Sequence, residues 1–349
     1  MRKLALSAAL LALLAACGDG QPFFEEPGGE SPTQSEGDGE VEGTNDEGSL
    51  TGTLPPGTND PSRGRGITRY EEENEQGGGY VQNARYNAEN DSFVVDNLAF
   101  DGFNRYRRGR DLDTLGGYGV FDGVETVRDS QTGALIDQFT YRALYGASRN
   151  NVRVDGEILP STQFAIVRTG SYLEYGFGGF IYLRNGDVTL PTSGQAQFTG
   201  DYAGIRTYSE DEGLEFTRGD MEVAIDFEDF NAGNGVRGRV YNRELFDITG
   251  DPIPLTNDHN VDGGRIFLPD LRFVVGPGTM SDDGELTNGI FSRAYNDAGE
   301  LVTYEEGSYY AILAGDGPDE LVGVFVIESA DPRFENNNAQ ETGGFILYR

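Results

Sequence analysis

Apolar and polar residues alternate with a period of two in many stretches after residue 190. In residues 220–228, Met221, Val223 and Ile225 fall on one face of an extended strand, and acidic residues fall on the other. Short runs of this kind, separated by turn residues, indicate β-strands. We place eight strands at residues 195–205, 215–227, 235–241, 265–275, 288–296, 308–314, 321–328 and 343–349.

The last of these strands, residues 343–349, is apolar and has no following segment to cover its edge. An uncovered apolar edge invites pairing with other chains. Pairing it with residues 195–205 removes both free edges at once. We therefore predict that residues 191–349 form an eight-stranded, up-and-down antiparallel β-barrel whose interior is filled by side chains.

Residues 63–190 also lack a sustained helical period and predict a second β-rich domain. Two strands within residues 80–103 are joined by a polar turn at residues 87–91. Further strands are expected at residues 118–127, 136–145, 162–168 and 172–183. The fold class is therefore all-β, with an N-terminal β-rich domain followed by the barrel.

The N-terminus carries an export signal. Arg2 and Lys3 precede a short apolar run that ends in small residues, which is typical of a signal peptide over residues 1–16. The run closes on Leu-Ala-Ala-Cys, which resembles the bacterial lipobox and implies lipidation of Cys17; Gly18 after it favours the outer membrane. The alternative is an ordinary signal with a chance cysteine. Several acyl chains would make a stable anchor.

Residues 17–62 predict a flexible tether. From residue 18 onward this segment holds eleven acidic residues, no basic residue and almost no aliphatic ones, so it cannot bury enough apolar surface to fold. The whole chain has a formal net charge of −33. Phosphate backbones would repel such a chain, which excludes nucleic acid as a partner.

Scarcity of residue types limits the chemistry. The chain has one cysteine and one histidine, His259. That excludes a Cys/His zinc site, a Ser-His-Asp triad and a Cys-His pair. Phosphate-binding loops and nucleophile motifs are also absent from the sequence. We therefore expect a protein that is not an enzyme.

One segment has the spacing of a calcium loop. Asp258, Asn260 and Asp262 alternate and are followed by a glycine, as in the first half of an oxygen-ligand Ca²⁺ loop. Pro269 stands where the twelfth, acidic ligand belongs. The two interpretations are a Ca²⁺ site and a polar hairpin loop.

Two further features could bind a ligand. His259 is a candidate haem ligand, although a lone loop histidine is more often simply solvated. Tyr172, Tyr175 and Phe177 lie on a glycine-rich strand and would suit an exposed recognition surface. The alternative for these aromatic residues is packing between the two domains.

The barrel region has a Pro-x-x-Gly opening, an Asp-Phe…Gly strand pair and a closing Ala-x-Glu-x-Gly-Gly-x-Phe. The positions concerned are Pro191, Gly194, Tyr202, Asp226, Phe227, Gly238, Ala339, Glu341, Gly343, Gly344 and Phe345. In these motifs it resembles the barrel domain of transferrin-binding protein B and related surface lipoproteins. The resemblance implies that residues 63–190 are the family's handle domain and that the chain has one lobe.

The resemblance implies an outer-membrane, surface-exposed lipoprotein that binds a ligand without catalysis. The ligand would be an iron or haem carrier protein from the host or environment, haem itself, or another solute. One alternative is a structural or assembly lipoprotein that contacts other envelope components. Another is a transmembrane barrel, since alternation also fits strands with a lipid-facing side.

Overall fold

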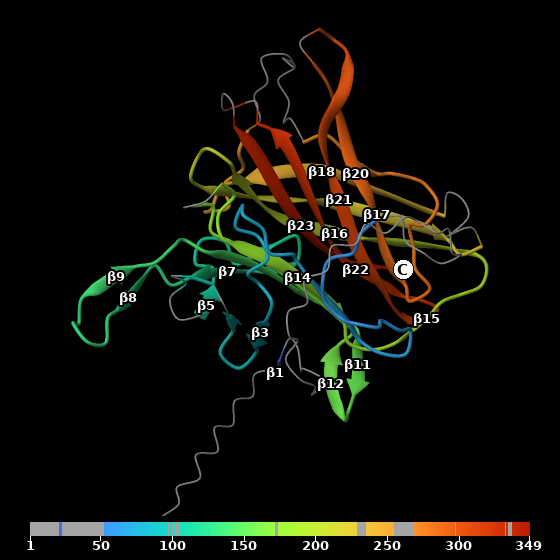
Figure 1. The fold of residues 1–349 in the computed structure, drawn as a ribbon, viewed down its shortest axis with the longest axis horizontal. Helices are drawn as coiled ribbons and strands as arrows, with labels where there is room; N and C mark the ends of the chain where they lie inside the picture. Colours follow the sequence, from blue (N-terminus) through green and yellow to red (C-terminus); the bar gives the residue numbers. More distant parts are fainter. Residues whose placement is uncertain are drawn as a thin grey trace, which may run out of the picture.

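The structure is a computed structural model (Figure 1). It describes residues 21–22, 52–96, 98–99, 101, 105–171, 174–228, 235–254, 268–296, 298–331, 333 and 337–349. These residues form strands and turns, with no helix among them. The predicted all-β class is confirmed.

The C-terminal part of the chain forms a closed, eight-stranded antiparallel barrel, as predicted. Each strand pairs with the next in sequence, which is the up-and-down arrangement. The strands are β16 (Gln195–Tyr208), β17 (Leu214–Asp226), β18 (Val236–Phe246), β19 (Leu271–Phe273), β20 (Glu285–Tyr295), β21 (Leu301–Asp316), β22 (Glu320–Ala330) and β23 (Asn338–Tyr348).

Pairing between β16 and β23 closes the barrel. Tyr202 lies opposite Phe345, and Gly204 lies opposite Gly343. The predicted partner of residues 195–205 is thus confirmed. Several strands are longer than expected; β19 is shorter, and residues 265–267 of its predicted span lie outside the described residues.

The N-terminal part forms an open sheet with the strand order β1-β3-β4-β5-β7-β10-β13-β14-β2, with β6 paired to β7. Its strands are β1 (Gln21–Pro22), β2 (Ile67–Tyr70), β3 (Ala84–Asn87), β4 (Ser92–Val95), β5 (Arg105–Arg108), β6 (Thr114–Leu115), β7 (Tyr118–Gly123), β10 (Arg142–Ala147), β13 (Thr162–Arg168) and β14 (Gly178–Arg184). The hairpin of β3 and β4, around residues 87–91, is the predicted one.

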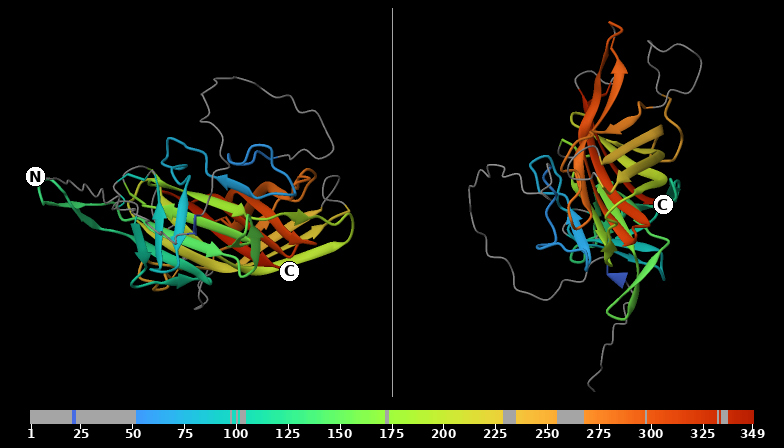
Figure 2. Two further views of the ribbon diagram at one scale, coloured as in Figure 1. Left: turned by 90° about the horizontal axis from the view of Figure 1, so that it is seen from below. Right: turned by 90° about the vertical axis from the view of Figure 1, so that its right-hand side faces the viewer.

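Two small hairpins leave the open sheet (Figure 1). One joins β8 (Thr126–Arg128) to β9 (Leu135–Asp137), and the other joins β11 (Asn151–Val154) to β12 (Glu157–Pro160). The connecting strand β15 (Val188–Thr189) runs parallel to the end of β21 and leads into the barrel. Figure 2 shows the open sheet lying against one side of the barrel.

Three apolar clusters follow from strand alternation. The first fills the barrel, and the second lies between the barrel wall and the open sheet. The third covers the other face of the open sheet. In β13, Phe164 and Ile166 face the barrel whereas Ala165 and Val167 face away, so this strand is buried on both sides.

Polar contacts also join the sheet to the barrel. Arg69 of β2 forms a two-pronged ion pair with Glu285 of β20, at 2.7 and 2.8 Å. The Tyr118 hydroxyl donates to the carbonyl of Asp201 and accepts from the amide of Ile346, both at 2.8 Å. These long-range contacts make the sheet and the barrel one packed body.

Residues 56–58, which the sequence places in the tether, pair with β2. Thr58 donates its amide to the carbonyl of Thr68, and Tyr70 donates to the carbonyl of Pro56. The chain is therefore paired with the sheet before residue 63. The composition of this segment, rich in proline and polar residues, does not predict the pairing, because the contacts are made by backbone groups.

Candidate functional site

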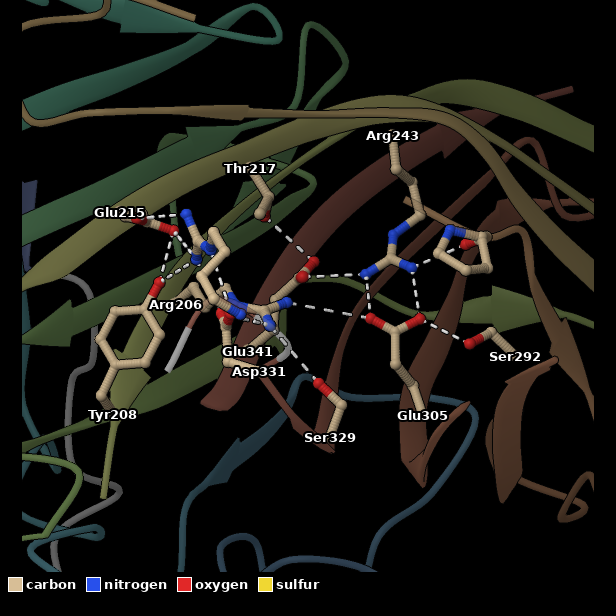
Figure 3. A network of polar contacts seen from close by, with 12 residues as sticks. Arg206, Tyr208, Glu215, Thr217, Arg243, Ser292, Glu305, Ser329, Asp331 and Glu341 are labelled. Carbon is tan, nitrogen blue, oxygen red and sulfur yellow. Dashed lines mark hydrogen bonds and ion pairs between the residues drawn. The ribbon is translucent and has the colours of Figure 1, made fainter. Parts of the chain in front are cut away.

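The inward side chains of the barrel are apolar at one end and charged at the other. At the end near Ala196 and Ile225 its inward residues are apolar. At the other end, beside the β16–β17 and β22–β23 turns, the same inward rows carry charged groups. These are Arg206, Glu215, Arg243, Glu305, Asp331 and Glu341. Figure 3 shows these six side chains close together. We call them, together with Arg333, the buried charge network.

Arg243 is the centre of this network and is 0% exposed. It binds both oxygens of Glu305, at 2.6 and 2.9 Å, and one oxygen of Glu341 at 2.9 Å. Its remaining N–H groups donate to the Tyr202 hydroxyl at 3.2 Å and the Pro269 carbonyl at 2.7 Å. All five donors of the guanidinium are used, and the pKa of Arg243 is held above its ordinary value because the nearby carboxylates outweigh burial.

The two carboxylates beside Arg243 have further donors. Ser292 donates to Glu305 at 2.6 Å, and Thr217 donates to Glu341 at 3.0 Å. Both glutamates are 1% exposed. Paired and hydrogen-bonded charges of this kind tolerate burial, whereas isolated ones do not.

Arg206 and Arg333 extend the network to the turns. Arg206 bonds Asp331 at 3.1 Å, and Arg333 bonds Asp331 at 2.7 Å and Glu215 at 2.9 Å. Burial alone would raise the pKa of Asp331, but the hydrogen bonds from Arg333 and the charges of both arginines bring it below its ordinary value. The network therefore fixes the β16–β17 and β22–β23 turns to each other.

The barrel wall parts beside this network. Strands β21 and β22 pair from Ala314↔Glu320 only as far as Glu306↔Glu328. Beyond that point β21 continues into the β20–β21 hairpin, which stands above the rest of the barrel (Figures 1 and 2). We call the gap between residues 301–305 and residues 329–330 the seam.

A groove of about 710 Å³ runs along the outer wall into the seam. Its lining includes Tyr304, Glu306, Tyr310, Val326, Glu328 and Ser329. Ser329 accepts a hydrogen bond from Arg206 at 3.4 Å, so the groove ends against the buried charge network. Tyr304 lines the groove and also lies close to Arg206 of the network. Burial raises the pKa of Tyr304, and the charge of Arg206 opposes this rise.

The sequence-predicted site residues are mostly outside the described residues. This holds for Cys17, Tyr172, Asp258, His259, Asn260 and Asp262. Tyr175 is 4% exposed, and burial together with the charge of Glu328 raises its pKa to about 12. Phe177 is half-buried and packs on Tyr80, with ring centroids 5.5 Å apart. These two aromatic residues are packed into the body.

Within the described ranges, no group of three His, Cys, Asp or Glu side chains is arranged to hold a metal ion. No helix long and apolar enough to span a membrane occurs among the residues that the structure describes.

The charge network was missed by sequence reasoning, although a signal exists. Inward positions of β23 read Ala339, Glu341, Gly343, Phe345 and Leu347, so a glutamate occupies an apolar row. A charged residue in phase with apolar ones indicates a buried partner of opposite charge. The sequence does not say which strand supplies that partner.

No protein-family model matches this chain, and no curated protein sequence matches it. Solved structures with a similar fold were found. A single-site mutant of transferrin binding protein B (TbpB) from Haemophilus parasuis Hp5 is 12% identical, with a TM-score of 0.29; 81% of this chain and 59% of that chain are covered. Intact Ap-TbpB with its N and C lobes is 13% identical, with a TM-score of 0.29, over 82% and 60%.

A third structure, described as a surface lipoprotein, is 12% identical with a TM-score of 0.24, over 56% of this chain and 79% of that one. This chain spans about three fifths of the TbpB chains that it matches. At these identities the similarity concerns the fold.

Proposed function

We propose that this chain is an outer-membrane lipoprotein, anchored through Cys17 and exposed at the cell surface, that binds a ligand without catalysis. One observation carries the binding role. The barrel is filled by apolar side chains at one end and by the buried charge network at the other, whereas the groove lies on its outer wall. A ligand would therefore be met from outside, which favours a macromolecule.

The polarity of the barrel supports an anchored body over a transmembrane barrel. Inward residues of β16 such as Phe198 are buried, whereas its outward Gln195, Gln197 and Thr199 are exposed. Elsewhere the open sheet covers the outer wall. A transmembrane barrel has the reverse pattern, with an apolar outer band and a polar interior.

Fractionation tests the anchor. The wild-type protein is expected in the membrane fraction and released by detergent, while Cys17→Ser is expected in the soluble fraction. Protease treatment of intact cells should degrade the wild type if it faces outward. Equal membrane association of both forms would contradict anchoring through Cys17.

Ligand capture is tested with the purified full-length protein in detergent as bait. Transferrin and haemin, the ligands that the sequence resemblance suggests, are the first two probes, followed by proteins from the native environment. Recovery of an iron or haem carrier supports the binding role. Recovery of envelope proteins alone would contradict it and favour the structural or assembly role.

A further inference from the structure

Two strand edges that do not pair with each other border the seam. Residues 301–305 of β21 pair with β20 on one side, through Tyr295↔Leu301 and Arg293↔Thr303. On the other side no described strand pairs with them, because the pairing of β21 with β22 stops at Glu306. Ser329 and Ala330 of β22 pair with β23 but not with β21.

A register shift explains why the edges separate. The β20–β21 pairing shifts between Ser292 and Arg293, so that Tyr304 is an extra residue on β21. Bulges of this kind bend a strand and increase its local twist. The bulge lies where the hairpin leaves the barrel, at the last residues before β21 meets β22. The bulge in β21 therefore accounts for the separation of β21 from β22 at the seam.

Residues 301–305 include no lysine and no proline. Soluble proteins blunt free edges with lysine, proline or a covering segment. Leu301 is 52% exposed and its cross-strand partner Tyr295 is 75% exposed, while Val302, on the other face of the strand, is 39% exposed. An extended segment added alongside residues 301–305 would pair the backbone and cover part of this apolar surface.

Charge at the base of the seam indicates the kind of segment. Glu306 and Glu328 are exposed and lie directly opposite each other on β21 and β22. Like charges in this position destabilise a strand pair, and a cation placed between them would relieve the repulsion. Tyr304 and Tyr310 line the same groove, and tyrosine rings favour cations as well.

We propose that the seam binds an extended, basic segment of a partner protein by β-strand addition, with a lysine or arginine of that segment between Glu306 and Glu328. This deepens, and rests on, the proposed binding function. Five residues of edge, at about 3.3 Å per residue, match a segment of about five residues. The formal charge of −33 also favours a basic partner over a second copy of this chain or its own acidic residues 18–62.

Fluorescence anisotropy with defined peptides tests the proposal on the full-length protein in detergent. The probe is a labelled hexapeptide of alternating valine and lysine. One control peptide replaces lysine by glutamate, and another carries N-methyl groups on alternate backbone amides, which removes strand pairing while keeping the charge. Only the unmethylated lysine peptide is expected to bind. Equal binding of the methylated peptide would overturn strand addition.

Matched variants locate the site. The variant Glu306→Gln/Glu328→Gln is expected to bind the lysine peptide about tenfold or more weakly, because both carboxylates face the cation. The control Glu222→Gln/Glu228→Gln makes the same change in net charge on and just after β17, four strands along the barrel from β21. Its affinity is expected to stay within about twofold of the wild type. Equal losses in both variants would overturn the assignment to the seam.

Hydrogen exchange gives a second, direct readout. Backbone amides of residues 301–305 and 329–330 are expected to exchange more slowly when the lysine peptide is bound. Unchanged exchange would overturn the proposal, as would a dimer that the peptide dissociates, because a second copy would then be the occupant. Failure here leaves membrane anchoring and ligand capture by other surfaces intact, so it is distinguishable from failure of the proposed function.

Discussion

Replacing Arg243 with methionine is expected to destabilise the barrel strongly. Methionine approximates the length of the arginine stem but removes the charge and all five hydrogen-bond donors. Glu305 and Glu341 would then remain in the interior, each 1% exposed, without their shared cation. The damage comes less from the lost contacts than from the two carboxylates left behind.

The size of the effect follows from this geometry. Removing one partner of a buried ion pair costs about 3–5 kcal/mol of unfolding free energy. For a packed body of about 300 residues that loss corresponds to a drop in Tm of roughly 5–8 °C. Ser292 and Thr217 still donate to the glutamates, which limits the loss to this range and spares the fold.

Urea unfolding followed by far-UV circular dichroism measures the change, since the chain contains no tryptophan for fluorescence. Arg218→Met is the matched control. Arg218 pairs with Glu244 at 2.9 Å, but its side chain is 48% exposed. Exposed pairs contribute about 0–1 kcal/mol, so this variant should unfold near the wild-type midpoint.

A triple variant separates charge from volume. Arg243→Met combined with Glu305→Gln and Glu341→Gln removes the uncompensated charges and should recover much of the lost stability. If Arg243→Met costs less than about 1 kcal/mol, or if the triple variant is no more stable than it, then uncompensated charge is not the cause.

Two further changes test the sheet–barrel interface and the network. A Cβ atom at Gly344 would lie 2.3 Å from the ring of the buried Phe164, so Gly344→Ala should lower the free energy of unfolding in urea by about 1–3 kcal/mol. Gly64→Ala, where a Cβ atom would meet no atom within 4 Å, should leave it unchanged. Equal losses in the two variants would refute the steric argument. The pKa of Asp331 is lower in the folded than in the unfolded protein, so its charged form stabilises the fold above about pH 4. This stabilisation is lost as the pH falls from about 4 to below the folded-state pKa. Asp331→Asn should therefore lose less stability than the wild type between about pH 5 and pH 3, and parallel pH profiles would contradict this.

The barrel could be predicted from the sequence because alternation and edge closure are local rules with a global result. Once the row containing Phe345 faces inward, its strand needs two neighbours, and β16 and β22 are the ones available. The hairpin of β11 and β12 was not expected, since its strands are short and their side chains largely exposed. In these two strands few apolar residues alternate with polar ones, so the pattern indicates a strand only weakly.

The candidate site was less accessible to sequence reasoning. Arg206, Arg243 and Glu305 come from three different strands, and their mutual distances depend on the shear of the barrel. The seam depends on a one-residue bulge at Tyr304, which alternation alone does not locate. For the candidate residues Tyr175 and Phe177 the structure adds what the sequence could not give: Tyr175 is buried, whereas Phe177 is half-buried and packs on Tyr80.

Closure by β16 and β23 also governs when the protein can fold. A barrel wall is incomplete until its first and last strands pair. Here Thr199 of β16 pairs with Tyr348 of β23. The wall around the apolar interior is therefore incomplete until β23 has paired with β16. Because this pairing joins residues far apart in the sequence, we expect the barrel to close slowly.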